Sequence, residues 1–325
     1  MGKATSLKLN TELCYDLDES DSVEEYNEKA IGTQFSNNSK LKYQIKTSFD
    51  KTTFIIDESD SVWDHDNPEI VLRTKITGFC DIEQILLAKN AIERFCNSKN
   101  KTPKIVLYIE YLFGNGFEFN SGDNSSNEIE VIVKLLSAQN FYKIFIYEPY
   151  DIDYLNKCVD VDFNIHPEKR WRKTSMIHDF EEVLRQYSDK VGIVFANKKM
   201  YDEYMPIVKM MINCECTYPN YMQEHAILEK TFSNEIKQFA IIDSGIYSGA
   251  TAYKIIKALQ KEYSVSNKID LFIAHFPVIR KNKYCSYINE SINKIYISDS
   301  HYTNNGYHVL INPLYIKTKI IKSKY

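Results

Sequence analysis

The chain has 325 residues, of which 44% are hydrophobic and 26% are charged, and its formal net charge at pH 7 is −4. Apolar residues are spread along the whole chain, so the composition predicts a globular protein long enough for two domains and excludes a largely disordered one. The negative charge disfavours a nucleic-acid partner, because such proteins present a basic surface to phosphates. No apolar run reaches the roughly 20 residues that a membrane span needs.

The chain has seven cysteines, and their spacing is irregular. An odd number of irregularly spaced cysteines favours reduced thiols and therefore a cytoplasmic protein, and the acidic N-terminal segment does not resemble a secretory signal. Cys214 and Cys216 form the only close pair in the sequence. No second pair or neighbouring histidine completes four zinc ligands, so the sequence assigns no metal to this pair.

Taken in chain order, residues 1–45 are polar and acidic and are interpreted as a loosely ordered arm with an edge element. Residues 46–165 and 166–325 are then predicted to form two domains in which strands and helices alternate. Asp81 is the expected N-cap of the first helix. In the first domain we expect strands at 53–56, 70–72, 104–108 and 143–147, and helices at 81–96 and 128–138. In the second we expect strands at 191–195, 238–242, 270–274 and 294–297, and helices at 177–186, 199–211 and 250–259.

This alternation predicts an α/β protein with mainly parallel sheets covered by helices on both faces. In such sheets ligands bind beyond the carboxyl ends of the strands, in the loops that lead into helices. We therefore expect the ligand-binding and catalytic residues in those loops.

One of these loops stands out, because the apolar strand 238–242 runs into Asp243 and the motif Ser248-Gly249-Ala250-Thr251 then opens a helix. Unpaired N–H groups at a helix start bind phosphate, and the Ser248 and Thr251 hydroxyls add donors. Asp243 can accept hydrogen bonds from ribose hydroxyls, and Gly249 permits a close backbone approach. An ordinary turn with Asp243 as a cap is the alternative. The predicted ribose-phosphate-binding residues are Asp243, Ser244, Gly245, Tyr247, Ser248, Gly249, Ala250 and Thr251.

The loop resembles the phosphoribosyl-diphosphate motif of type I phosphoribosyltransferases, in which a strand runs into two acids and then a Thr/Ser-Gly-x-Thr sequence. Ser244 stands in place of the second acid. Within that superfamily, residues 70–325 resemble the ribose-phosphate pyrophosphokinase (phosphoribosyl-diphosphate synthetase) family in the correct order. The segments that carry this resemblance are 81–96 with the following KIVLYIEY, 126–151, 227–230, 272–278 and 295–300.

The resemblance implies two tandem type I phosphoribosyltransferase-like domains with mainly parallel sheets flanked by helices. In this family the C1 hydroxyl of ribose 5-phosphate attacks the β-phosphorus of Mg-ATP, and AMP leaves. The resemblance therefore implies Mg²⁺, ATP as co-substrate, a phosphorylated ribose as acceptor, and assembly into a homo-oligomer. It places the catalytic lysine at Lys230, for which a solvated lysine at a strand end is the alternative. The family's adjacent arginine is absent, because Thr231 and Phe232 follow.

The nucleotide half of the family pattern is matched less well. The implied nucleotide contacts fall on Glu118, Tyr150 and His275, although His275 also fits a packed core histidine. The implied metal ligands fall on Glu148 and Asn197, whose oxygens suit Mg²⁺. At the family's metal-site histidine the chain has Tyr150.

Three functions are compatible with these residues. The leading hypothesis is a divergent diphosphotransferase whose acceptor is ribose 5-phosphate or ADP-ribose, the acceptor in divergent relatives from phage pathways that rebuild NAD. A phosphoribosyltransferase is the second, although such enzymes usually have one domain of this type. The third is a non-catalytic regulatory or ligand-sensing subunit, which the loss of family residues on the nucleotide side favours.

Overall fold

The structure of the protein is a computed structural model that describes residues 5–8, 43–48, 51–56, 63, 66–112, 128–163, 171–187, 189–223, 225–246, 248–263, 268–275, 283–298 and 318–321. The chain divides into two compact units, the first extending to Thr174 and the second beginning at Ser175. The division falls after the boundary expected at residue 165, because a short strand ending at Thr174 completes the first sheet. Each unit is described by itself below.

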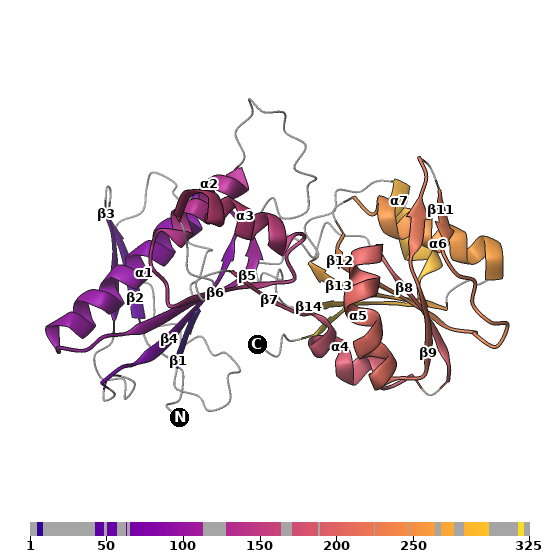
Figure 1. The fold of residues 1–325 in the computed structure, drawn as a ribbon, viewed down its shortest axis with the longest axis horizontal. Coiled ribbons are helices and arrows are strands. Elements are labelled where there is room, and N and C mark those ends of the chain that lie inside the picture. The colour runs from indigo at the N-terminus through magenta and orange to yellow at the C-terminus, as the bar shows by residue number, and fades with distance from the viewer. Residues whose placement is uncertain are drawn as a thin grey trace. The chain divides into compact units, whose positions relative to one another are not determined.

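The first unit contains a five-stranded sheet in the order β1-β4-β5-β6-β7, in which all neighbouring strands are parallel, and a separate antiparallel hairpin, β2-β3 (Figure 1). Its elements are β1 (Thr5–Lys8), β2 (Tyr43–Ser48), β3 (Lys51–Ile56), β4 (Glu69–Ile76), α1 (Phe79–Ser98), β5 (Lys104–Leu112), α2 (Glu128–Ser137), β6 (Lys143–Tyr147), α3 (Ile152–Phe163) and β7 (Arg172–Thr174). The strand order advances in one direction only, so right-handed crossovers bring α1, α2 and α3 to the same face of the sheet.

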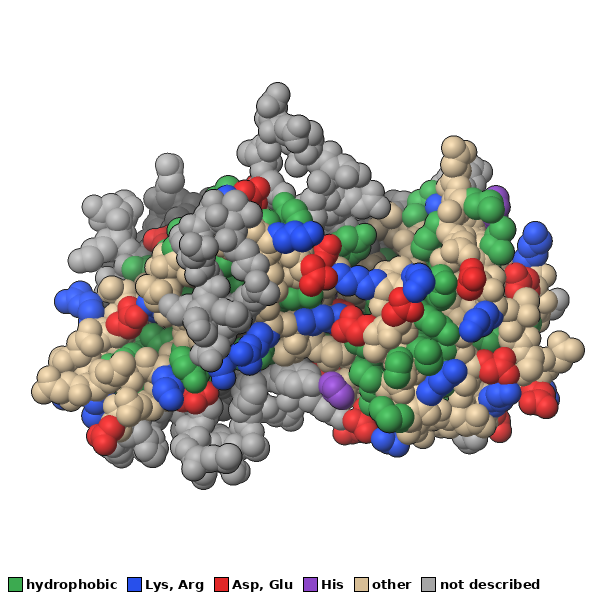
Figure 2. Space-filling model, in the orientation of Figure 1, with side chains coloured by type: hydrophobic (Ala, Val, Ile, Leu, Met, Phe, Trp, Pro, Cys, Tyr) green, Lys and Arg blue, Asp and Glu red, His purple; other side chains and the backbone are tan. Residues whose placement is uncertain are grey.

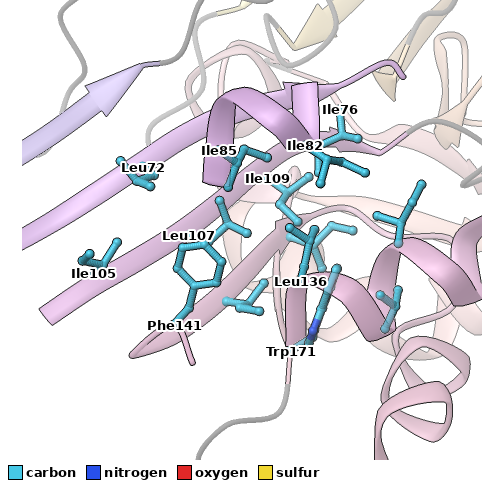
Figure 3. Packing of buried hydrophobic residues seen from close by; sticks show 14 of the residues in the cluster. Leu72, Ile76, Ile82, Ile85, Ile105, Leu107, Ile109, Leu136, Phe141 and Trp171 are labelled. Atoms are coloured by element: carbon cyan, nitrogen blue, oxygen red, sulfur yellow. The ribbon is translucent and has the colours of Figure 1, made fainter. Parts of the chain in front are cut away.

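One hydrophobic core joins these three helices to the sheet. Figure 3 shows Leu72 of β4 and Leu107 of β5 in this core, near Ile85 of α1. Burial of each such side chain stabilises the fold by about 1.5–3 kcal/mol. Trp171 is also fully buried, and its indole N–H donates to the Ser137 hydroxyl at 2.9 Å, which satisfies its one polar atom.

Helix α1 corrects one expectation, because it begins at Phe79 and Asp81 is not its N-cap. Instead, the Asp81 carboxylate lies within the first turn and accepts hydrogen bonds from the Gly78 N–H at 3.1 Å and the Thr77 hydroxyl at 2.8 Å. Burial raises the pKa of this carboxyl, and its hydrogen bonds partly oppose that shift. An acid three residues into a helix reaches back to the entering chain in this way.

The second unit contains a six-stranded parallel sheet in the order β15-β14-β13-β12-β8-β9, and a separate antiparallel hairpin, β10-β11. Its elements are α4 (Ile177–Leu184), β8 (Val191–Phe195), α5 (Lys198–Met211), β9 (Cys214–Thr217), β10 (Pro219–Tyr221), β11 (Ala226–Leu228), β12 (Phe239–Gly245), α6 (Ala250–Tyr263), β13 (Ile269–His275), α7 (Lys283–Ser291), β14 (Lys294–Ser298) and β15 (Thr318–Ile321).

The strand order of this second sheet reverses between β8 and β12. From β8 the chain crosses through α5 to β9 on one side, whereas from β12 it advances through α6 and α7 toward the other edge. Helices therefore cover both faces: Phe180 of α4 packs on Phe272 of β13 at a ring separation of 5.3 Å, and Ile255 and Ile288, from α6 and α7, join the core on the opposite face. Ligands of open α/β sheets bind at such a reversal, beyond the carboxyl ends of the strands.

The α/β class with mainly parallel sheets flanked by helices is thus confirmed. Among the described elements, helices cover both faces of the second sheet only, whereas α1, α2 and α3 share one face of the first. None of the helices in the described part of the chain is long and apolar enough to cross a membrane. Acidic and basic side chains are interspersed over the described surface that Figure 2 shows. The chain has 40 basic and 44 acidic residues, so the two signs are nearly balanced in number.

The packing of β8 against β12 leads to a first prediction. A Cβ atom at Gly192 would lie 2.8 Å from Cδ1 of Phe239 and 3.0 Å from Cγ2 of Ile236. We expect Gly192→Ala to lower the free energy of unfolding by about 1–3 kcal/mol, because added volume in a packed core forces its neighbours to shift. Urea unfolding followed by circular dichroism measures this loss.

The second variant for this test is Gly192→Ala combined with Phe239→Val, which removes the Cδ1 and Cε1 atoms that the new methyl group would meet. The combined loss should be smaller than the sum of the two single losses. Strictly additive losses would contradict the packing described here.

Candidate functional site

The loop that follows β12 leaves the second sheet beside the end of β13. Asp243, near the end of β12, is 6% exposed. The Ile246 N–H donates to the backbone oxygen of His275 at 3.1 Å, which joins the start of the loop to the last residue of β13. The Gly245 N–H points back to Oδ1 of Asp243 at 3.4 Å. The Asp243 carboxylate is therefore held at the carboxyl edge of the sheet.

The end of the loop depends on Gly249, whose φ of +82° lies in the left-handed region that favours glycine. A Cβ atom there would lie 3.0 Å from Cδ1 of Ile288 on α7. Helix α6 begins immediately afterwards, with the Tyr253 N–H donating to the Gly249 oxygen at 2.9 Å. Ser248 and Thr251 are exposed on either side of this start. Exposed hydroxyls at a helix N-terminus are suited to binding an anion.

The β10-β11 hairpin is attached beside this loop. The Tyr221 hydroxyl donates to the backbone oxygen of Ala196 at 2.6 Å, and Nζ of Lys254 on α6 donates to the Gln223 oxygen at 3.0 Å. Tyr221 is 43% exposed, but its hydroxyl is turned inward. Burial raises the pKa of this phenol, and the charge of Asp243 raises it further, so the phenol remains neutral near the carboxylate.

Tyr221 was not among the site residues predicted from the sequence. The chain has 24 tyrosines, and no motif separates this one from the others. Its place beside the loop follows from the position of the hairpin, which attaches both to the loop after β8 and to α6. The β10-β11 hairpin lies between β9 and β12 in the chain and returns to the point where the strand order reverses. The sequence carries no local signal for this return.

Lys230 is exposed and follows β11. Its N–H donates to Oγ1 of Thr217, the last residue of β9, at 3.0 Å. In the sheet Thr217 pairs with Val194 of β8, and Val194 pairs with Ile241 of β12. The backbone of Lys230 therefore lies at the same carboxyl edge as Asp243, separated from β12 by about two strand spacings, or roughly 10 Å.

Two of the predicted nucleotide and metal residues already have structural partners. Oδ1 of Asn197 accepts the Met200 N–H at 2.9 Å and so caps α5. Glu148 is buried after β6, and its Oε1 atom lies 2.9 Å from Nζ of Lys173 on β7. Glu148 also has a φ of +42°, uncommon for a residue with a side chain. Such strained positions persist only where the surroundings enforce them.

The remaining predicted residues are distributed between the two units. Tyr150 is 42% exposed between β6 and α3 of the first unit, and His275 is buried at the end of β13 in the second. Glu118 and Tyr247 lie outside the described residues. In the ranges that the structure describes, no group of three His, Cys, Asp or Glu side chains is placed to hold a metal ion.

The described structure thus brings together Asp243, Ser244, Gly245, Ser248, Gly249, Ala250 and Thr251 in one loop, with His275 beside it and Asn197 at the end of β8. Glu148 and Tyr150 belong to the first unit.

Two successive parallel sheets flanked by helices, the second with this loop at its reversal of strand order, have the fold of two tandem type I phosphoribosyltransferase-like domains. The structure is similar to the crystal structure of phosphoribosylpyrophosphate synthetase from Mycobacterium smegmatis, with a TM-score of 0.61 over 86% of this chain and 85% of that chain. The sequence identity is 8%, so the likeness shows the fold alone. No family model and no curated protein matches the sequence.

A second prediction concerns the backbone of the loop. We expect Gly249→Ala to lower the free energy of unfolding by about 1–2 kcal/mol, because a residue with a Cβ is strained in the left-handed region. We also expect it to weaken binding of ribose 5-phosphate, measured as a smaller ligand-induced rise in melting temperature.

Adding Ile288→Val removes the atom nearest to the new methyl group but leaves the backbone strain. The double variant should therefore recover only part of the lost stability. A Gly249→Ala protein with wild-type stability and wild-type ligand binding would contradict the loop geometry.

Proposed function

We propose that the protein transfers the diphosphate group of Mg-ATP to the C1 hydroxyl of a phosphorylated ribose and releases AMP. The observation that carries this proposal is the loop from Asp243 to Thr251, which lies at the reversal of strand order in the second sheet. Support also comes from the tandem fold, which is similar over most of its length to a phosphoribosylpyrophosphate synthetase.

The two ends of the loop suit the two ends of a ribose 5-phosphate. At the start of α6, backbone N–H groups and the hydroxyls of Ser248 and Thr251 can donate to the phosphate oxygens. At the end of β12, the Asp243 carboxylate can accept hydrogen bonds from the 2- and 3-hydroxyls of the sugar. Held at both ends, the ribose would present its C1 hydroxyl in a fixed orientation, and orientation supplies much of the rate in phosphoryl-type transfer.

Lys230 and Tyr221 have separate roles in this proposal. The Lys230 ammonium group would approach the phosphates of the nucleotide and stabilise the negative charge that develops as AMP leaves. Tyr221 belongs to the hairpin next to the loop, and its phenol remains neutral because burial and the charge of Asp243 raise its pKa. The hairpin would thus exclude water from the reacting groups without adding a negative charge.

The residues implied as magnesium ligands do not fit a resident ion in this structure. The Glu148 carboxylate is paired with Lys173, and the Asn197 side chain caps α5. Mg²⁺ retains several waters and often binds through substrate phosphates. We therefore treat magnesium as part of the Mg-ATP substrate.

A ligand-sensing or regulatory subunit is the second candidate function. The Glu148–Lys173 pair favours it, because it neutralises a carboxylate that the family resemblance assigns to the metal. In that case the loop would still bind a phosphorylated ribose, but no diphosphate would be transferred. As the resemblance also implies, we expect a homo-oligomer under either function.

The third prediction is that AMP forms from Mg-ATP when ribose 5-phosphate and ADP-ribose are offered side by side, and that one acceptor is preferred. Asp243→Asn should lower the rate roughly 10- to 100-fold, because hydrogen bonds to a charged group contribute about 1.5–3 kcal/mol each. The matched control is Asp202→Asn on the exposed face of α5, which should leave the rate unchanged.

AMP release is measured by chromatography, with the melting temperature recorded for each ligand. No AMP with either acceptor, together with a ligand-induced rise in melting temperature, would replace diphosphate transfer by the sensing function. No AMP and no rise would contradict both.

The fourth prediction concerns Lys230. Lys230→Ala should lower kcat roughly 100-fold, as the loss of one transition-state donor does elsewhere, and change the affinity for the ribose ligand by less than about threefold. Lys237→Ala is the control, since Lys237 is an exposed lysine in the same connection to β12. Equal effects of the two substitutions on kcat would contradict a catalytic role for Lys230.

A further inference from the structure

Strand β9 carries two cysteines whose side chains share one face. Cys214 and Cys216 are two residues apart in the strand, so both point to the same side of the sheet. Their Sγ atoms are 3.5 Å apart, and both are free thiols. Cys214 is partly exposed, whereas Cys216 is buried. The two sulfurs are therefore neighbours, and a reagent in solvent can reach one of them.

The two thiols differ in acidity. The hydrogen bond from Cys216 lowers the pKa of Cys214, and the positive charge of Lys209 lowers it further, although burial opposes both effects. The same hydrogen bond raises the pKa of Cys216, and burial adds to that rise. Cys214 thus has the features of an attacking thiol, namely thiolate character and access to solvent, and Cys216 is positioned as its resolving partner.

The opposite face of β9 holds the segment that contains Lys230. Oε2 of Glu215 accepts the Ser233 N–H at 2.8 Å, and Oγ1 of Thr217 accepts the Lys230 N–H at 3.0 Å. Within the described sheet β9 is an edge strand, paired with β8 only. A change in the backbone of β9 therefore alters the two hydrogen bonds that hold residues 230–233. Among the described strands, only β8 pairs with β9 and opposes such a change.

We propose that Cys214 and Cys216 form a reversible thiol-oxidation site that a low-molecular-weight disulfide converts into an intramolecular disulfide. The Cys214 thiolate attacks one sulfur of the reagent and displaces the other as a thiolate. Cys216 then loses its proton, its sulfur attacks Sγ of Cys214, and the second reagent thiolate leaves. The protein gives up two electrons and two protons in all, and the reagent is reduced to two thiols.

The strand makes this bond strained and hence reversible. Two residues of a strand span roughly 6.6 Å, near the upper end of the Cα separations that disulfides tolerate. Ring closure therefore requires β9 to bend, and strained disulfides are the readily reduced, regulatory ones. Bending loosens the two hydrogen bonds that hold residues 230–233. The chemistry of the pair is independent of the proposed function, whereas any consequence for diphosphate transfer depends on it.

The test uses the full-length protein and oxidised glutathione. Trypsin releases residues 210–230 as one peptide, which contains both cysteines of the pair and no other. We expect this peptide to lose two hydrogen atoms on oxidation and to recover them on reduction. Amide exchange at Lys230 and Ser233 should accelerate at least tenfold in the oxidised protein. Cys216→Ser should accumulate a glutathione adduct at Cys214, and Cys80→Ser, which removes an exposed lone thiol, should behave as the wild type.

Three results would overturn the proposal. The first is retention of both thiols in this peptide at a glutathione concentration that already modifies Cys80. The second is a wild-type protein that stops at the Cys214 adduct, since Cys216 then does not resolve it. Disulfide formation with unchanged amide exchange would disprove the coupling to residues 230–233. None of these measurements depends on diphosphate transfer, so a failure here is distinguishable from a failure of the proposed function.

Discussion

In the second unit, the reversal of strand order between β8 and β12 is the constraint on which the candidate site depends. The Ala196 N–H donates to the Ile242 oxygen at 2.9 Å and joins the ends of the two strands where the chain departs in opposite directions. Because all strands of this sheet are parallel, their carboxyl ends lie at one edge, and the loops there face each other across the reversal. This reversal places Asp243 at the end of β12 next to Asn197, which follows β8. It also brings Ala196, the residue that accepts the Tyr221 hydroxyl, to the same edge.

The reversal also explains why glycine is needed at two positions. Gly192 allows β8 to lie against Phe239 of β12, and Gly249 allows the loop to turn into α6 against Ile288 of α7. The first leaves room for the Phe239 ring beside the strands that flank the site, and the second permits the turn into the helix whose N-terminus would face the phosphate. Substitution at either position changes packing and site geometry together.

Periodicity predicted most of the long elements, because apolar spacing over segments such as 81–96 and 250–259 reports the buried face directly. It did not predict the helices α3 (Ile152–Phe163) and α7 (Lys283–Ser291). The strand–loop–helix arrangement around Asp243 and the Ser-Gly-x-Thr motif could also be predicted, since its sequence signals are local; binding of a ribose phosphate there stays a prediction. Short elements such as β7 and β10 carry too few residues for a pattern. The partner of Glu148 was not predictable, because its ion pair with Lys173 on β7 depends on tertiary structure. The cap formed by Asn197 has a local signal, since Asn directly before a helix is a preferred N-cap, but the family resemblance assigned this residue to the metal instead.

We propose that a phosphorylated ribose binds at the loop between β12 and α6, and a crystal structure with ribose 5-phosphate would reveal its position. We expect the phosphate within hydrogen-bonding distance of Ser248, Thr251 and the first backbone N–H groups of α6, with the 2- and 3-hydroxyls on the Asp243 carboxylate. A ligand bound elsewhere, with this loop unoccupied in crystals that admit the sugar, would contradict this proposal.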